Sequence, residues 1–324
     1  MSLSMRAALR DQYGGPEVLS LREVPRPEPR EDEVRIAVAA TSVTAGDGFL
    51  LQGRPYVVRL VYGLARPKHP VVGLDVAGRV DAVGAKVTRF RPGDLVFGEA
   101  AGAAADFACA KEARLAPAPT GIPLVDAATL PIAGCTALQG LRLGGTGPGT
   151  KVLIIGAAGG VGSVAVQVAR ALGAVPTAVC STANVDRMRA LGAADVLDYT
   201  TTDLTAGDAR YDVVFDLVAS HPLAAIRRLL APEGVYVAGA GNGGDWVGPL
   251  PRIAQCVTTS WFGKQRFVPL AAKVNAEDLE TLRAWVASGA VRPAVDRRYA
   301  LTDIVEAYRA QGAGHARGRS VVVV

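Results

Sequence analysis

An apolar run that leads straight into a glycine-rich turn, at residues 151–162, constrains this chain more than any other feature. Residues 152–155 are aliphatic, residues 156–162 read GAAGGVG, and a helix-compatible stretch follows at once. In the order strand, tight turn, helix, backbone N–H groups and the positive end of the helix face a bound phosphate. The turn therefore indicates a dinucleotide-binding site, with alanine at the first glycine of the usual G-x-G-x-x-G pattern.

The pattern around the turn favours this interpretation over a glycine-rich hairpin or an ordinary connection. Between residues 151 and 240, apolar runs alternate with amphipathic stretches, which predicts a parallel, doubly wound α/β sheet. Residues 241–248 contain too many glycines for a regular element, so we expect a loop there. The expected strands are 152–155, 177–179, 196–197, 213–217 and 235–238, and the expected helices are 161–172, 185–191 and 222–230.

The first third of the chain is predicted to be rich in β-structure. Residues 34–38 alternate between apolar and polar side chains, and residues 71–83 are valine-rich. Short strands separated by Gly and Pro turns predict a barrel-like β domain, which the proline-rich residues 117–123 bring to an end. The four valines that close the chain should form a buried or paired strand. Further helices are expected at residues 124–143, 277–288 and 301–310.

Composition narrows the class of protein. A chain of 324 residues, half of them hydrophobic, is long enough for two domains with sizeable cores. No apolar run approaches the length of a bilayer span and the first residues lack a signal-peptide core, so we expect a cytoplasmic protein without a membrane partner. Four widely spaced cysteines fit a reducing compartment.

The charge pattern gives little support to nucleic-acid binding. The net charge is +5 and the isoelectric point is near 9.1, which can indicate an anionic partner. The arginines are spread along the chain without a dense basic run, so a solvated arginine-rich surface accounts for the charge. Only three histidines are present, which excludes a histidine-rich metal site.

Four motifs, in order along the chain, carry a family resemblance. They are PVVGLDVAG at residues 70–78, RPGDLVFG at 91–98, the glycine turn, and LGAAD at 191–195. The chain resembles the medium-chain dehydrogenase/reductase superfamily, and within it the zinc-independent quinone oxidoreductases of the zeta-crystallin type. The resemblance implies a homodimer whose terminal valine strand belongs to the β domain. It also implies a GroES-like β-rich catalytic domain at residues 1–121, a Rossmann dinucleotide-binding domain at 122–270, and a return to the catalytic domain at 271–324.

The residues at the zinc positions of the superfamily predict a metal-free protein. Zinc-binding members resemble this chain but have an early cysteine and a Gly-His-Glu triplet. Here residues 42–47 contain no cysteine, and the triplet reads Gly73, Leu74 and Asp75. Leucine, which stands in the place of histidine, cannot bind a metal ion. The closely spaced four-cysteine lobe that binds structural zinc is absent as well.

The end of the second predicted strand favours NADPH over NADH. NAD-binding sites usually place a carboxylate there, about 20 residues beyond the turn, on the ribose 2′-hydroxyl. This chain has Ser181 at that place, and hydroxyl and amide groups can hydrogen-bond a 2′-phosphate that a carboxylate would repel. Ser181, Asn184 and Tyr199 match positions that bind this phosphate in the family. Ordinary packing after a strand is the alternative for Tyr199.

The resemblance assigns further cofactor contacts by position. A surface histidine in a basic tail is an equal alternative for His315, and Cys135, beside the expected site, is interpreted as a buried structural cysteine. In the turn, the expected contacts are Ala158, Gly159, Gly160, Val161 and Gly162. Elsewhere the matching positions are Thr136, Val218, Gly239 and, in a segment that closes over the cofactor, His315.

The loop at residues 42–47 should carry catalytic donors. The family commonly has Ser-Val-Asn-Pro-x-Asp, whereas this chain has Thr44 and Ala45 in place of the asparagine and the proline. A metal-free hydride transfer needs hydrogen-bond donors for the charge that develops on the acceptor oxygen. The candidates are Thr44, Asp47 and Tyr56. A capping role for Asp47 and a place in the wall of the site for Tyr56 are the alternatives.

These features together predict an NADPH-dependent, metal-free oxidoreductase that transfers hydride to a quinone or a similar carbonyl acceptor. An enoyl or 2-alkenal reductase, which delivers hydride to an activated C=C bond, uses the same fold and cofactor. A third alternative, from another class, is an NADPH-binding sensor or nucleic-acid-binding protein with little turnover.

Overall fold

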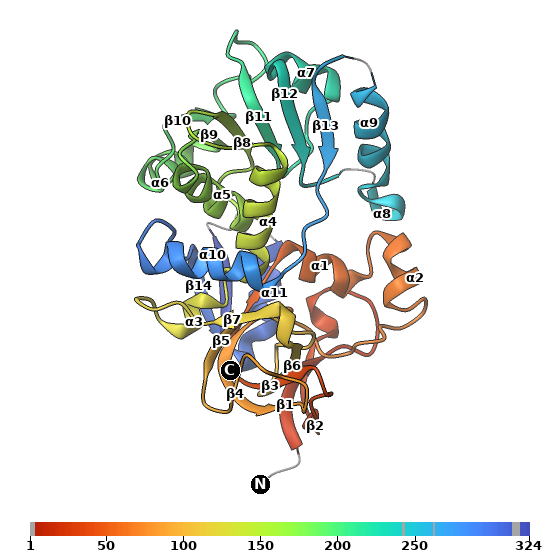
Figure 1. The fold of residues 1–324 in the computed structure, drawn as a ribbon. Coiled ribbons are helices and arrows are strands. Elements are labelled where there is room, and N and C mark those ends of the chain that lie inside the picture. Colours follow the sequence, from red (N-terminus) through yellow and green to blue (C-terminus); the bar gives the residue numbers. More distant parts are fainter. Residues whose placement is uncertain (1–3, 242–243, 262, 313–317) are drawn as a thin grey trace. The chain divides into compact units, whose positions relative to one another are not determined.

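The chain folds into two compact units. The computed structural model describes residues 4–241, 244–261, 263–312 and 318–324, and Figure 1 shows its fold. Unit 1 comprises residues 1–135, 274–289 and 293–324, and unit 2 comprises residues 136–273 and 290–292. Unit 1 is therefore built from both ends of the chain, and unit 2 from its middle.

Unit 2 contains a six-stranded sheet in which neighbouring strands are parallel, in the order β10-β9-β8-β11-β12-β13. The chain runs outward from β8 in one direction, then returns to β11 and continues in the other, which confirms the predicted doubly wound arrangement. The strands are β8 (Lys151–Ile155), β9 (Val175–Cys180), β10 (Asp195–Asp198), β11 (Tyr211–Asp216), β12 (Leu230–Ala238) and β13 (Arg266–Pro269).

Helices connect these strands. Four of the five residues of β8 are buried, because helices cover both faces of a parallel sheet. The α5 helix turns Val164, Ala165 and Val168 into the core. Along unit 2 the helices include α5 (Gly160–Ala171), α6 (Val185–Ala190), α7 (Leu223–Leu229), α8 (Gly244–Val247), α9 (Leu250–Ser260) and most of α4 (Pro131–Leu143).

The prediction of a loop at residues 241–248 is wrong for its second half, which forms the short helix α8. Gly244 and Gly248 have positive φ angles and lie at the two ends of this turn, where left-handed backbone favours glycine. The three residues between them are compatible with a helix. The Gly248 N–H donates to the Gly244 carbonyl at 3.1 Å and closes the turn.

Unit 1 contains a seven-stranded sheet and a two-stranded sheet. The larger sheet has the order β14-β15-β3-β4-β5-β7, with β6 paired to β3, and its pairs are antiparallel except for β14 and β15. The small sheet has β1 (Ser4–Leu9) and β2 (Ser20–Pro25). The large sheet has β3 (Glu33–Val43), β4 (Asp75–Val83), β5 (Leu95–Glu99), β6 (Phe107–Lys111), β7 (Leu115–Pro117), β14 (Val295–Ala300) and β15 (Arg319–Val323).

The helices of unit 1 come from both ends of the chain. They include α1 (Ala45–Gln52), α2 (Arg59–Tyr62), α3 (Leu124–Ala127), α10 (Ala276–Ala287) and α11 (Ile304–Gly312). In either unit, none of the helices in the described residues is long and apolar enough to cross a membrane.

The last strand closes the sheet of unit 1. β15 pairs with β14 in parallel and with β3 in antiparallel register. This confirms the expectation that the terminal valines complete the β domain. Val322 is fully buried in a cluster with Val43, Ile304 and Tyr308, so residues from distant parts of the chain share one core.

Val322→Ala should lower the free energy of unfolding by about 2 kcal/mol, because truncation leaves a cavity in a closed core. Val175→Ala, the same change at the exposed start of β9, should change it by less than about 0.5 kcal/mol. Urea denaturation of both variants measures the difference. Equal effects of the two changes would contradict the buried position of the terminal strand.

Candidate functional site

The glycine-rich turn joins β8 to α5 at the carboxyl edge of the unit 2 sheet. Gly156 has a φ of +85°, and the Ala157 N–H donates to the Val179 carbonyl at 3.1 Å, which fixes the turn to β9. A Cβ on Gly162 would lie 2.2 Å from the Gly156 carbonyl oxygen. The backbone itself therefore requires glycine at both positions, because the helix begins so close to the strand.

Gly159, in contrast, is not required by the protein's own packing. It has a φ of −72°, and a Cβ there would meet only the Gly156 carbonyl oxygen, at an ordinary 3.5 Å. Gly159 is the N-cap of α5, whose first turn carries neither a capping side chain nor an acidic residue. The first N–H groups of the helix have no intrahelical partner. The turn therefore fits a dinucleotide pyrophosphate, which would take the space that a side chain would fill.

The end of β9 gathers the polar groups expected to bind a 2′-phosphate. Ser181 precedes the short turn Thr182–Asn184, and the Asn184 amide donates to the Ser181 hydroxyl at 3.1 Å. The Asn184 Oδ1 atom is buried, and among the described residues it has no hydrogen-bond partner. Arg187 of α6 donates to the Ala158 carbonyl at 3.3 Å, which sets its charge beside the glycine turn. Hydroxyl, amide and guanidinium groups are the donors that suit a phosphate.

Tyr199 follows β10 at the same edge of the sheet. Its N–H donates to the Cys180 carbonyl at 3.1 Å, so its backbone lies beside the end of β9. The side chain is 59% exposed. Tyr199 is therefore accessible at this edge, and its role in binding the 2′-phosphate stays a prediction.

A carboxylate that the sequence pattern did not reveal also lies at this edge. Asp198 is opposite Cys180 in the pairing of β10 with β9, and it accepts hydrogen bonds from the Thr182 hydroxyl at 2.5 Å and the Thr200 hydroxyl at 2.7 Å. These bonds lower the pKa of Asp198, so it is ionised at neutral pH. The usual sequence position of the acid is the end of β9, whereas Asp198 belongs to the neighbouring strand β10.

The loop after β11 is held by the buried Asp216. Its carboxylate accepts from the N–H groups of Val218 at 3.0 Å and Ala219 at 2.8 Å. Ala219 has a φ of +60°, and Val218 is 48% exposed at the carboxyl edge of the sheet. Gly239 lies after β12, where a Cβ would come 2.8 Å from the Leu217 side chain. Packing thus explains the glycine at 239, while the exposed Val218 lies where ligands bind in doubly wound sheets.

Asp216 also anchors a buried network that sequence reasoning missed. The Tyr236 hydroxyl donates to its Oδ2 at 3.0 Å, and Arg252 of α9 lies 3.5 Å from the same oxygen. Arg252 donates further to the His221 carbonyl at 2.8 Å. Burial, followed by the charge of Asp216, raises the pKa of Tyr236, so the phenol stays protonated. No spacing in the sequence links these residues, because only the fold brings β11, β12 and α9 together.

The remaining cofactor candidates are distributed over unit 2 and the chain end. Thr136 is half-buried on α4, and Gly160 and Val161 lie in the first turn of α5. His315 lies outside the described residues. Cys135 is buried, and burial raises its pKa to about 12, which agrees with a structural cysteine.

In unit 1, Thr44 and Asp47 form a capping box at the start of α1. The Asp47 N–H donates to the Thr44 hydroxyl oxygen at 3.0 Å, and the Thr44 N–H donates to the Asp47 carboxylate at 2.8 Å. Both residues are buried. The capping alternative for Asp47 is thus present in the structure. Thr44 uses its oxygen as an acceptor there, and a hydroxyl in that role still has a proton to donate.

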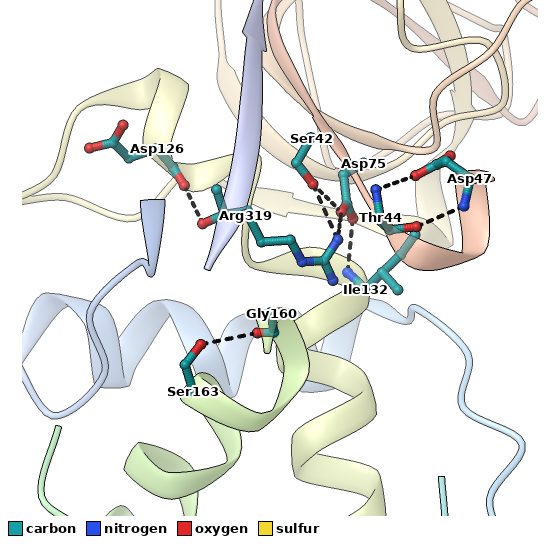
Figure 2. A network of polar contacts seen from close by, with 10 residues as sticks. Ser42, Thr44, Asp47, Asp75, Asp126, Ile132, Gly160, Ser163 and Arg319 are labelled. Atoms are coloured by element: carbon teal, nitrogen blue, oxygen red, sulfur yellow. Dashed lines mark hydrogen bonds and ion pairs between the residues drawn. The ribbon is translucent and has the colours of Figure 1, made fainter. Parts of the chain in front are cut away.

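A buried ion pair lies in the same unit (Figure 2). Asp75 Oδ2 accepts from the Ser42 hydroxyl at 2.7 Å and from Arg319 at 3.1 Å, and Oδ1 accepts from the Ile132 N–H at 2.9 Å. Burial raises the pKa of Asp75, while Arg319 and Ser42 oppose that shift. The network ties β3, β4, α4 and β15 together beside Asp47. The sequence motif at residues 70–78 includes Asp75, but no sequence pattern indicates its ion-pair partner Arg319.

Tyr56 begins the short turn Tyr56–Val58 and is half-buried. The Arg59 guanidinium lies 4.8 Å from its ring centroid. This contact is a cation–π interaction, which gives the ring a structural role. A catalytic role for the Tyr56 hydroxyl stays a prediction.

The donor set at the zinc positions does not fit zinc. Leu74 has no ligating atom, and both Asp75 carboxylate oxygens already accept hydrogen bonds. Over the described part of the chain, no group of three or more His, Cys, Asp or Glu side chains is arranged to hold a metal ion.

Comparison with known proteins shows which families the chain resembles. Family models match residues 30–122 as an alcohol dehydrogenase GroES-like domain and residues 191–322 as a zinc-binding dehydrogenase. A chloroplast envelope quinone oxidoreductase homolog from Arabidopsis thaliana is 32% identical over 98% of both chains. An NADPH-dependent alkenal/one oxidoreductase from the same plant is 30% identical over 98% of this chain and 79% of its own. The quinone oxidoreductase structure from Coxiella burnetii matches 99% of both chains with a TM-score of 0.88 and 29% identity.

The chain therefore belongs to the medium-chain dehydrogenase/reductase superfamily, in the zinc-independent quinone oxidoreductase-like family. This confirms the resemblance and the fold class, a GroES-like domain combined with a Rossmann domain. The protein is an oxidoreductase enzyme of a superfamily that binds a nicotinamide cofactor.

Asp47→Asn should raise stability more at pH 8 than at pH 4. Burial, partly offset by the bonds to Thr44 and reinforced by the charge of Asp75, raises the pKa of Asp47 to about 6. Its unfolded carboxyl ionises near pH 4, so ionisation destabilises the native state progressively as pH rises from about 4 through 6. Asparagine carries no charge. The stability gained by the substitution should therefore be roughly 2 kcal/mol larger at pH 8 than at pH 4.

Urea denaturation at both pH values measures this difference. Asp186→Asn, which removes a fully exposed carboxylate from α6, is the matched control and should show little pH-dependent gain. An Asp47→Asn variant that is destabilised equally at pH 4 and pH 8 would show that the buried carboxylate is not strained by its charge.

Proposed function

We propose that this protein is an NADPH-dependent, metal-free reductase that transfers hydride to a quinone or a similar carbonyl acceptor. The observation that carries the cofactor assignment is the donor set beside the glycine turn, in which Ser181, Asn184 and Arg187 come together. The 32% identical relative that is named a quinone oxidoreductase homolog supports the acceptor class.

The glycine turn and the end of β9 would hold different parts of the cofactor, which supplies the hydride when bound. The first-turn N–H groups of α5 would bind the pyrophosphate, and Gly159 would leave them accessible. Ser181 and Asn184 would hydrogen-bond the 2′-phosphate, with Arg187 as the counter-charge. The Asp198 carboxylate would repel the 2′-phosphate, although its oxygens already accept hydrogen bonds from the Thr182 and Thr200 hydroxyls.

In the absence of a fitting zinc site, hydrogen-bond donors must stabilise the negative charge on the acceptor oxygen. We assign this role to the Thr44 hydroxyl, whose oxygen is fixed by the Asp47 N–H while its proton can point to an acceptor. Asp47 is then a positioning residue that holds the Thr44 backbone. Tyr56 is the second candidate donor.

An alkenal or enoyl reductase is the second candidate function. The relative named NADPH-dependent alkenal/one oxidoreductase is 30% identical over nearly the whole chain. Hydride delivery to an activated C=C bond would use the same turn and the same donor. The sensor and nucleic-acid alternative loses support, because these relatives are named as enzymes.

We propose a homodimer as well. Over the described residues, β13 is one of the two edge strands of the unit 2 sheet, and the neighbouring α9 exposes Ile253 and Val257. An edge strand beside exposed apolar side chains favours association with another chain. The domain limits at residues 121 and 270 and the cytoplasmic location stay predictions, and both Arabidopsis relatives reported above are named as chloroplast proteins.

The purified protein should oxidise NADPH with a panel of quinones at a higher kcat/KM than with α,β-unsaturated carbonyl compounds. With the better acceptor, NADH should give a kcat/KM at least about tenfold lower than NADPH, which corresponds to roughly 1.4 kcal/mol of phosphate binding. Comparable values with NADH would contradict the cofactor assignment. A stoichiometric zinc signal in elemental analysis would overturn the metal-free mechanism.

Ser181→Asp should reverse the cofactor preference. A carboxylate at the end of β9 repels the 2′-phosphate and can accept from a ribose 2′-hydroxyl, so kcat/KM for NADPH should fall by about tenfold or more. Asp198→Asn should act in the opposite direction, because it removes a negative charge from the same edge. Ser288→Asp, which adds the same charge in unit 1, is the control. If all three variants keep the same preference, the 2′-phosphate does not bind at this edge.

A further inference from the structure

The segment between Asp47 and Asp75, residues 48–74, has an unusual charge pattern. It contains four Lys or Arg residues and one His but no acidic residue. In a chain whose acidic and basic residues are nearly balanced overall, this stretch is locally and uniformly basic. Such a segment attracts anionic surfaces. We call it the basic segment.

Apolar side chains of the basic segment are exposed to solvent. Leu60 and Val61, which are consecutive residues of α2, are 69% and 68% exposed. An apolar group of this kind marks an interaction surface. The other members of the group are Phe49, Tyr62 and Leu64.

These apolar side chains are presented by ordered structure. Arg59 donates to the Gly53 carbonyl at 2.9 Å and lies 4.4 Å from the centroid of the Tyr13 ring. The Tyr13 hydroxyl donates to the Gly63 carbonyl at 2.6 Å, and Lys68 donates to the Val61 carbonyl at 2.9 Å. The contacts fix the short helix α2 against the rest of unit 1. The exposed apolar group is therefore a built feature of the fold.

Basic side chains belong to the same segment as the apolar group. Arg66 and Lys68 are exposed, and Arg54 and Arg59 are half-buried. Asp11 is in electrostatic reach of Arg66 but already forms an ion pair with Arg22 at 2.9 Å. Apolar side chains that project between basic ones match a bilayer with anionic headgroups, into which they can insert.

We propose that the basic segment docks this protein on the surface of an anionic lipid membrane, with Leu60 and Val61 inserted among the headgroups. We had expected no membrane partner because no run can span a bilayer, and a surface contact needs no span. The positive charge of the segment favours anionic lipid over a protein partner. The polar rim of a protein interface usually forms salt bridges of both signs, and this segment has no acidic side chain to contribute. The inference concerns binding alone and holds whichever acceptor the enzyme reduces.

Sedimentation with sucrose-loaded vesicles tests the proposal on the whole chain. The protein should pellet with vesicles of phosphatidylcholine containing about 30% phosphatidylglycerol, and salt at about 0.5 M should release it. Arg66→Gln and Lys68→Gln should each weaken partitioning by about fivefold. Leu60→Asp should weaken it by about tenfold.

Leu95→Asp is the matched control, because Leu95 is an exposed leucine of β5 outside the basic segment. This variant should partition as the parent does. Equal binding to pure phosphatidylcholine vesicles, or no binding to anionic ones, would overturn the proposal. So would a Leu60→Asp variant that raises KM for a water-soluble quinone but leaves vesicle binding unchanged, since the segment would then line the acceptor site. Vesicle binding without NADPH turnover would count against the proposed function only.

Discussion

The approach of α5 to the end of β8 is the constraint on which the site depends. A Cβ on Gly162 would come 2.2 Å from the Gly156 carbonyl oxygen, so the backbone closes here only with glycine. This approach aims the first N–H groups of α5 across the carboxyl edge of the sheet. The same turn carries Ala158, to which Arg187 donates, and thereby links the pyrophosphate site to the side chains at the end of β9. One tight turn thus organises both phosphate sites that we propose.

Two buried carboxylates have parallel roles in the two units. In unit 2, Asp216 fixes the loop that exposes Val218 and is itself held by Tyr236 and Arg252. In unit 1, Asp75 is held by Ser42 and Arg319, which ties the last strand to the loop of Thr44. Removing one partner of such a pair leaves an uncompensated buried charge, which costs far more than the pair contributes. Both carboxylates are fully buried, and both networks hold loops that carry candidate site residues.

Much of this molecule could be predicted from sequence because its patterns are local. The glycine turn, the alternation that gives the parallel sheet, and the terminal valine strand all rest on neighbouring residues. The contacts that the sequence did not reveal join residues far apart in the chain. Asp198 reaches the cofactor edge through strand pairing, and Arg252 and Arg319 join their carboxylates across large separations in sequence. The α8 helix was missed because the abundance of glycine outweighed the three residues that can form a turn.

A crystal structure of the protein with bound NADPH would test the proposed cofactor site. We expect pyrophosphate oxygens within hydrogen-bond distance of the first-turn N–H groups of α5, and the 2′-phosphate in contact with Ser181 and Arg187. A dinucleotide whose pyrophosphate lies away from the start of α5, or whose 2′-phosphate makes no contact with the end of β9, would contradict it.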